Sequence, residues 1–422
     1  MKLHKSLYRV IFLLFIIIQT TFSSVEITVL LSGILIVVLL LVEPLKISRS
    51  LSIALSYLLG ILTMGVLSSF FYKYELFDRV RDFVHFLKPI LLIFVAYLLV
   101  IRIDNTRFVL RLIVFLGVFL ALKHLVTLSI VDLPDELRID RIRAKAGAGS
   151  FIEMIALIVL LAFHKQHKII GSKSRKLFIL IMSISFILYF SRTMILGLIV
   201  FLLSIYGFTK LTRRAFEYIV FVIFVFGLSF SYLFTLNLDQ DEEGINKFLY
   251  KIRNSPAEVF ASPANYDPRN HKEIFKHWRG YEASTALNQM EDNPANYVIG
   301  KGFGALVDLG FKAPVGGENG LRYIPHLHNG YMYVFFKVGF VGLILYLILL
   351  FNLYKQVYFK SNSFSERTIR SIISGFGVYF FASSLVITGL YNLGEISIFC
   401  LGIFLAMAQI ESLKNEKLDS NG

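Results

Sequence analysis

The sequence is poor in the residues that stabilise soluble and secreted domains. Only 17% of its 422 residues are charged, and a single cysteine, Cys400, occurs in the whole chain. One cysteine excludes an intramolecular disulfide framework, and a soluble globular chain carries about 25% charged residues. No group of Cys and His has zinc-site spacing, and no GxxxxGK[ST] segment cradles a phosphate. A soluble enzyme and a disulfide scaffold are therefore excluded.

Long apolar runs are the dominant feature. Hydrophobic residues make up 56% of the chain, which also excludes a disordered protein. About 20 apolar residues suffice to cross a bilayer as a helix. The predicted spans are 8–24, 27–43, 51–71, 84–101, 108–131, 149–163, 176–191, 193–209, 215–236, 329–353, 371–390 and 394–410. The sequence thus predicts an all-α polytopic membrane protein: helices over 1–236, a large loop over 237–328, helices over 329–410 and a tail over 411–422.

The net charge of +14 is mostly a topology signal. With the N-terminus inside, the short inner loops carry more than twice as many Lys and Arg residues as the short outer loops. The positive-inside rule then predicts cytoplasmic termini, and it argues against a nucleic-acid partner. The first span follows Lys2, Lys5 and Arg9 like a signal peptide, but residues 21–24 offer no convincing cleavage site, so a retained anchor is expected.

The segment 237–328 is expected on the outer side. It is polar, contains the only tryptophan, Trp278, and at about 90 residues is too long for a passive connection. A helix is predicted over 271–292, ending before Pro294, with glycines at 300, 302 and 304 turning the chain back.

The strongest local motif is Pro325-His326-Leu327-His328-Asn329 at the start of the tenth span. On a continuous helix, His328 would share one face with Gly339 and Gly342. This pattern fits either a functional imidazole or a helix-packing stripe with a histidine at the interface.

Arginines supply the other candidate groups. Arg192 lies between two apolar runs, where it either meets an anion or snorkels to the interface. Arg279 in the outer loop is either a ligand-binding cation or a solvated surface charge. Arg138, Arg141 and Arg143 precede the glycine-rich turn 146–149 and could bind phosphate.

Further charged residues have competing interpretations. Lys337 and Glu153 lie inside predicted spans, where an ionisable group is a functional candidate by default. The alternative is that the two pair with one another. Asp239 and Asp241 could hold a divalent ion on a diphosphate, although an acidic run after a membrane span is usually solvated.

Taken together, these motifs resemble the O-antigen ligase and polymerase family of bacterial envelope proteins. The ligase signature is His-[Asn/Ser/Gln], nine residues, Gly, two residues, then Gly, Thr or Tyr, and His328-Asn329 with Gly339 and Gly342 match it completely. Ser191-Arg192 resembles the first essential arginine of the family. Arg279, ahead of Asp292-Asn293-Pro294 and the glycine turn, resembles the second.

The resemblance implies a GT-C-like glycosyltransferase of the bacterial inner membrane, acting on the periplasmic face. The donor would be a glycan on undecaprenyl diphosphate and the acceptor lipid A–core, with inversion and with no metal or cofactor. His328 would be the base, Arg192 and Arg279 would clamp the diphosphate, and Arg138, Arg141, Arg143, His326 and Asn329 would contact substrate.

Other activities stay open. A polymerase would use the same groups to join lipid-linked repeat units, although the complete signature favours a ligase. A transporter for lipid-linked glycans would be expected to show inverted repeats around a midplane site, and no internal repeat is visible. A catalytically inactive binding protein is a third alternative.

Overall fold

The computed structural model describes residues 4–21, 24–43, 47–130, 149–163, 169–238, 244–260, 274–275, 277–314, 320–361, 363–394 and 396–420. The helices that overlap the predicted spans are α1 (Lys5–Thr21), α2 (Val25–Val42), α3 (Arg49–Ser69), α4 (Leu76–Ile103), α5 (Thr106–Ile130), α7 (Ser150–Ala162), α8 (Ser172–Leu188), α9 (Arg192–Ile205), α10 (Arg213–Thr235), α15 (Gly330–Tyr354), α16 (Phe364–Ser383) and α17 (Ser397–Ser420). Helix α17 extends well into the predicted tail.

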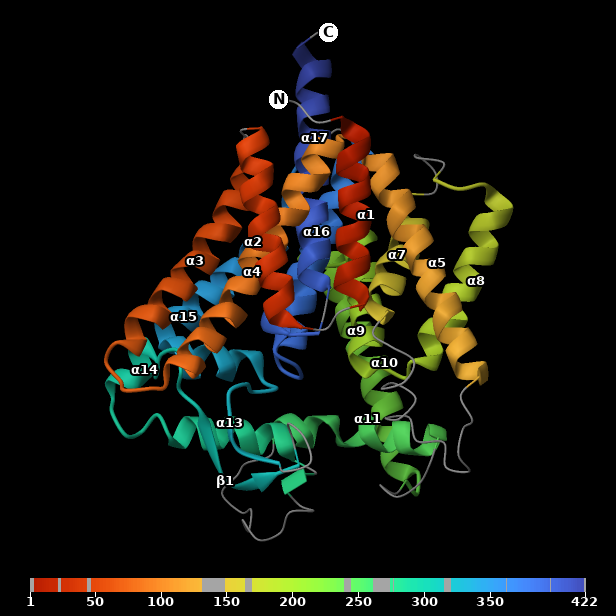
Figure 1. Cartoon of the computed structure of the whole chain (residues 1–422). Helices are drawn as coiled ribbons and strands as arrows, with labels where there is room; N and C mark the ends of the chain where they lie inside the picture. The colour runs from red at the N-terminus through yellow and green to blue at the C-terminus, as the bar shows by residue number, and fades with distance from the viewer. Residues whose placement is uncertain are drawn as a thin grey trace.

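The large loop adds elements of its own. These are α11 (Gly244–Phe260), α13 (Trp278–Asn288), α14 (Ala295–Ile299), β1 (Val307–Ala313) and β2 (Leu321–Ile324). Both chain termini lie at one end of the helical bundle, and α11, α13 and β1 lie at the other end (Figure 1).

Six of the described helices are long and apolar enough to cross a membrane by length and composition: α2, α3, α4, α5, α15 with the following η2 (Lys355–Tyr358), and α17. Helices α7 and α9 are shorter apolar helices. The chain is a multi-pass helical membrane protein; the count of twelve crossings and the GT-C-like arrangement stay predictions.

Helix α4 is the centre of the bundle and packs against α1, α2, α3 and α17. A Cβ atom on Gly402 of α17 would meet the carbonyl oxygen of Ile93 at 2.5 Å, so the two helices approach closely at this glycine. Phe12 and Phe15 of α1 stack on Phe399 of α17, with ring centroids 5.8 and 5.4 Å apart. Close packing around α4 thus joins the two ends of the chain.

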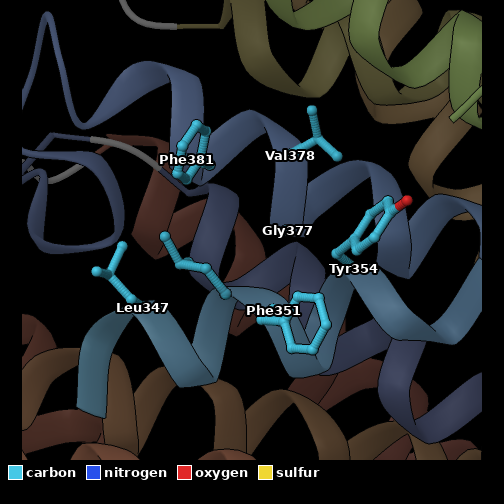
Figure 2. A pocket seen from close by; sticks show the side chains of 7 residues that line it. Leu347, Phe351, Tyr354, Gly377, Val378 and Phe381 are labelled. Atoms are coloured by element: carbon cyan, nitrogen blue, oxygen red, sulfur yellow. The ribbon is translucent and has the colours of Figure 1, made fainter. Parts of the chain in front are cut away.

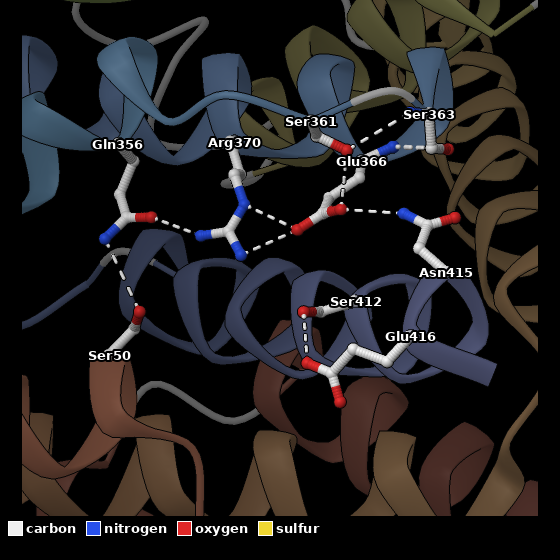
Figure 3. Close-up of polar contacts among 9 residues, drawn as sticks. All are labelled: Ser50, Gln356, Ser361, Ser363, Glu366, Arg370, Ser412, Asn415 and Glu416. Atoms are coloured by element: carbon white, nitrogen blue, oxygen red, sulfur yellow. Dashed lines mark hydrogen bonds and ion pairs between the residues drawn. The ribbon is translucent and has the colours of Figure 1, made fainter. Parts of the chain in front are cut away.

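A buried polar network ties α3, η2, α16 and α17 together near the end of the bundle that carries the termini (Figure 3). Arg370 donates from Nε and Nη2 to Glu366 Oε1, at 2.8 and 2.7 Å, and from Nη1 to Gln356 Oε1 at 2.7 Å. Asn415 of α17 donates to the second oxygen of Glu366 at 2.8 Å. The carboxylate of Glu366 is therefore the hub of the network.

Replacing Glu366 by Ala is expected to lower the free energy of unfolding by about 3 kcal/mol, because it leaves a buried guanidinium without its anion. Denaturant unfolding in detergent would measure the loss. Glu217→Ala is the control, since it breaks an i,i+4 pair with Arg213 that is largely exposed and should cost at most about 0.5 kcal/mol. Equal losses in the two variants would contradict a structural role for the buried network.

Helix α15 is sharply kinked, which corrects the sequence prediction of one continuous helix face. His328 precedes the helix, and Gly339 has the non-helical angles φ 68° and ψ −165°. In a straight helix the carbonyls of Phe336 and Lys337 would accept hydrogen bonds from residues four positions ahead. Here the backbone N–H groups of Lys301 and Gly302 donate to them, at 2.8 and 2.9 Å.

The predicted glycine turn packs directly against the kink of α15. Gly300, Gly302 and Gly304 have positive φ angles of 78°, 80° and 96°, which L side chains rarely adopt. A Cβ atom on Gly339 would overlap the backbone of Val298 and of Gly300. Gly339 of the signature thus permits close contact between the turn and the kink, whereas a Cβ atom on Gly342 would first meet the Val338 side chain of the same helix.

The described part of the loop also contains an antiparallel hairpin of β1 and β2, which the all-α prediction missed. Val307 pairs with Ile324, and Asp308 pairs with Tyr323. The strands are short, and their alternation of apolar and polar residues is too brief to stand out in the sequence. Inward-facing residues of β1 pack on α13, so the hairpin supports the helix that carries Arg279.

An apolar groove runs between α15 and α16 (Figure 2). It is lined by Leu347, Leu350, Phe351, Tyr354, Gly377, Val378 and Phe381. Phe381 also contacts Tyr331 at the start of α15, where the tyrosine hydroxyl donates to the Phe381 carbonyl at 2.6 Å. One lining residue of the groove, Phe381, thus contacts the start of α15.

Candidate active site

His328 lies in the turn between β2 and α15, and its side chain is 50% exposed. Its ring Nδ1 is 2.9 and 3.1 Å from the two carboxylate oxygens of Glu282 in α13. The backbone N–H of His328 also donates to Glu282 Oε2 at 3.0 Å. Glu282 itself is buried. An accessible imidazole is thus hydrogen-bonded through Nδ1 to a buried carboxylate.

Arg279 is brought to the same place by α13. It precedes Glu282 by three residues, about 4.5 Å along the helix axis, so the two side chains project from neighbouring positions of one helix surface. The helix is fixed to the hairpin by the Tyr281 hydroxyl, which donates to the Leu309 carbonyl at 2.6 Å. Helix α13 therefore carries both the half-buried Arg279 and the carboxylate that contacts His328.

Arg192 begins α9, after a break that separates α8 from α9 as the sequence predicted. Phe190 in this break has a positive φ of 47°. The guanidinium of Arg192 donates to the backbone carbonyl of Lys251 in α11, and α11 in turn contacts α13. The structure thus places Arg192 against a helix that adjoins the helix of Arg279; a shared contact with His328 stays a prediction.

Asn329 and His326, which were predicted to contact substrate, make contacts within the protein. The Asn329 side chain accepts from the Met332 backbone N–H at 3.0 Å and caps α15. His326 packs against His85 and Tyr333, with ring centroids 4.3 and 5.0 Å away. Both ring nitrogens of His326 are buried without a hydrogen-bond partner in the described part of the chain. Substrate contacts by these two residues stay predictions.

The electrostatic surroundings keep His326 neutral. Burial, followed by the neighbouring charges of His85 and Lys337, lowers the pKa of His326 well below its ordinary value of 6.5. Arg81 and His328 act in the same direction. The ring therefore resists protonation at physiological pH.

This shift predicts a pH-dependent stability. Because the pKa is lower in the folded protein than in the unfolded chain, the unfolded chain binds the extra proton below about pH 6.5. The contribution of His326 to the free energy of unfolding should be constant above that pH and fall below it by at most about 1.4 kcal/mol per pH unit. His326→Asn should flatten this slope in denaturant titrations, and His4→Asn, at an exposed position, should not. An unchanged slope in His326→Asn would contradict the assignment.

Lys337 and Glu153 do not pair with one another, contrary to the alternative drawn from the sequence. Lys337 forms a buried ion pair with Asp82 of α4 and donates to the Ala305 carbonyl at 2.5 Å. Glu153 accepts from the Tyr189 hydroxyl at 2.9 Å. The first contact holds the glycine turn against α4 and α15, and the second anchors the break that precedes Arg192.

Some predicted residues lie outside the described part of the chain. They are Arg138, Arg141, Arg143, Asp239 and Asp241. Within the described residues, no group of three or more His, Cys, Asp or Glu side chains could hold a metal ion. The phosphate-binding loop therefore stays a prediction, and the diaspartate stays the alternative that the sequence left open.

The sequence reasoning missed Glu282 and Asp82. Glu282 lies 46 residues from its partner His328, and Asp82 lies 255 residues from Lys337, so no local pattern announces either contact. A weak signal does exist for Glu282: it follows Arg279 at helical spacing in Trp278-Arg279-Gly280-Tyr281-Glu282.

The fold and these contacts define a multi-pass membrane protein with an exposed, carboxylate-supported histidine at the bundle end opposite the chain termini. Residues 177–347 match the family model described as O-antigen ligase. No curated protein matches the chain. The matched stretch includes Arg192, Arg279 and the complete histidine–glycine signature. This match supports an O-antigen ligase-like family, and the matched part of the chain is similar to membrane enzymes of the O-antigen ligase and polymerase kind.

Proposed function

We propose that the protein is a membrane glycosyltransferase that moves a glycan from undecaprenyl diphosphate to lipid A–core at the periplasmic face of the bacterial inner membrane. The observation that carries this proposal is the half-exposed imidazole of His328, supported by Glu282 from the same helix that bears Arg279. An imidazole so placed suits proton removal from an acceptor hydroxyl near neutral pH.

The proposed reaction is a single displacement at C1 of the first sugar. The acceptor oxygen forms a bond to C1 while the bond from C1 to the diphosphate oxygen breaks, and its electron pair leaves with the diphosphate. The acceptor proton passes to Nε2 of His328. Guanidinium groups of Arg192 and Arg279 bind the leaving diphosphate and stabilise the charge that it gains. Attack opposite the leaving group inverts the configuration at C1.

The lipid part of the donor needs an apolar surface beside this polar site. The groove between α15 and α16 supplies one (Figure 2), because Phe381 lines it and also contacts Tyr331, three residues after His328. We propose that the polyprenyl chain lies in the groove while its diphosphate stays at the interface.

A transfer assay with the purified protein tests the proposal. A labelled glycan on undecaprenyl diphosphate is incubated with lipid A–core, or with a second lipid-linked repeat unit. Glycosylated lipid A–core without lengthening of the lipid-linked glycan is the expected result. Chain lengthening without consumption of lipid A–core would instead assign the alternative polymerase reaction. No transfer to either acceptor would overturn the proposed function.

Metal removal provides a separate prediction. Because arginines provide the positive charge for the diphosphate in this account, transfer should continue at an unchanged rate after treatment with excess EDTA. Initial rates with and without EDTA, and with added Mg²⁺, would measure this. Complete dependence on Mg²⁺ would contradict the arginine clamp. It would favour a divalent ion, held by Asp239 and Asp241, as the group that binds the diphosphate.

A further inference from the structure

We infer that Glu282 is the positioning residue of His328: it fixes which ring nitrogen carries the proton and balances the positive charge that the ring gains during transfer. This inference rests on the proposed function of His328 as base. The family signature does not include Glu282, since the signature begins at His328.

The geometry sets the tautomer. Both oxygens of Glu282 lie within hydrogen-bond distance of Nδ1, at 2.9 and 3.1 Å, and an ionised carboxylate can only accept. Nδ1 must therefore carry the proton in the neutral ring. The unprotonated nitrogen is then Nε2, on a side chain that is 50% exposed, so the ring offers its lone pair on the side away from Glu282.

The same carboxylate holds the backbone. Oε2 of Glu282 also accepts from the His328 N–H at 3.0 Å, so one buried side chain fixes both the ring and the turn that carries it. Glu282 is held in its turn by α13, which is fixed to β1 through Tyr281 and through Gln289, whose amide donates to the Asp308 carbonyl at 2.8 Å. The orientation of His328 therefore depends on the hairpin and on α13 together.

Charge balance favours the same role. When Nε2 accepts a proton, the imidazolium forms an ion pair with a carboxylate that is already in place and buried, so no reorganisation is needed. The groups that act on His326 in the same turn include His85 and Arg81 of α4 and Lys337 of α15, and Arg279 precedes Glu282 by three residues on α13. Without Glu282, the new positive charge would lose the carboxylate that contacts the ring in the described part of the chain.

The test uses Glu282→Gln, which keeps the shape of the side chain. The amide can donate to Nδ1, which favours the tautomer with the proton on Nε2 and so removes the lone pair from the reacting side. We expect kcat for glycan transfer to fall on the order of 10²-fold or more, with KM for the lipid-linked donor changed by at most about twofold. Glu282→Asp should recover part of the rate, and Glu291→Gln, an exposed position in the same loop, should keep the wild-type rate.

A readout that does not depend on activity completes the test. The ¹⁵N NMR spectrum of the His328 ring should show a protonated Nδ1 in the wild-type protein and a protonated Nε2 in Glu282→Gln, with His328→Gln used to assign the signals. An unchanged tautomer, or a Glu282→Gln variant with wild-type kcat, would overturn the inference. If the wild-type protein transferred no glycan, the proposed function would fail, and the tautomer result would still decide whether Glu282 orients His328.

Discussion

Replacing His328 by Ala is expected to reduce glycan transfer by on the order of 10³-fold, because it removes the only group proposed to take the acceptor proton. General base catalysis by a positioned side chain contributes about 10²- to 10⁴-fold. The loss should appear in kcat more than in KM, since the imidazole acts in the transition state rather than in donor binding. Initial rates with purified protein and labelled donor would measure it.

His328→Gln separates the chemical role from a structural one. The glutamine amide can still donate to Glu282, so the turn before α15 should keep its conformation. His328→Gln should therefore retain wild-type thermal stability within a few degrees, because it keeps a donor for the buried carboxylate of Glu282. Equal rates in His328→Gln and the wild-type protein would remove His328 as the base.

Arg279→Lys is the second substitution with a large expected effect. Lysine keeps the charge but loses the planar pair of donors that matches a diphosphate. Removing one preorganised donor from a developing oxyanion typically costs about 10²- to 10³-fold, and we expect a loss of this size in kcat/KM for the lipid-linked donor. Transfer rates across a range of donor concentrations would measure it.

Arg322→Lys is the matched control. Arg322 forms two hydrogen bonds with Asp308 in the hairpin, at 2.7 and 2.9 Å, on the exposed surface. The same chemical change there should leave transfer nearly unchanged. A wild-type rate in Arg279→Lys, or an equal loss in both variants, would contradict a specific contact between Arg279 and the diphosphate.

The helices could be predicted because each apolar run carries its own signal. The break before Arg192 and the glycine turn at 300–304 were also predicted, since Ser191-Arg192 interrupts two apolar runs and glycines tolerate positive φ. The signature at His328, Gly339 and Gly342 pointed to the same family as the family model that matches residues 177–347. These features are local in sequence, which is why sequence alone reveals them.

Other features depend on contacts between distant residues. The partner of His328 is Glu282 on another element, and the partner of Lys337 is Asp82 in α4. The kink at Gly339 is accompanied by hydrogen bonds from the glycine turn. The prediction that His328, Gly339 and Gly342 share one helix face assumed a straight helix and was therefore wrong. Tertiary contacts of this kind leave no periodic pattern in the sequence.

The central claim is that His328, Arg279 and Arg192 serve one lipid-linked diphosphate at the bundle end opposite the termini. An electron cryomicroscopy structure with bound undecaprenyl diphosphate tests it most directly. The account predicts diphosphate density within hydrogen-bond distance of both guanidinium groups, with Nε2 of His328 facing the anomeric side. Diphosphate density at the end that carries the termini, or away from Arg279 and His328, would contradict the account.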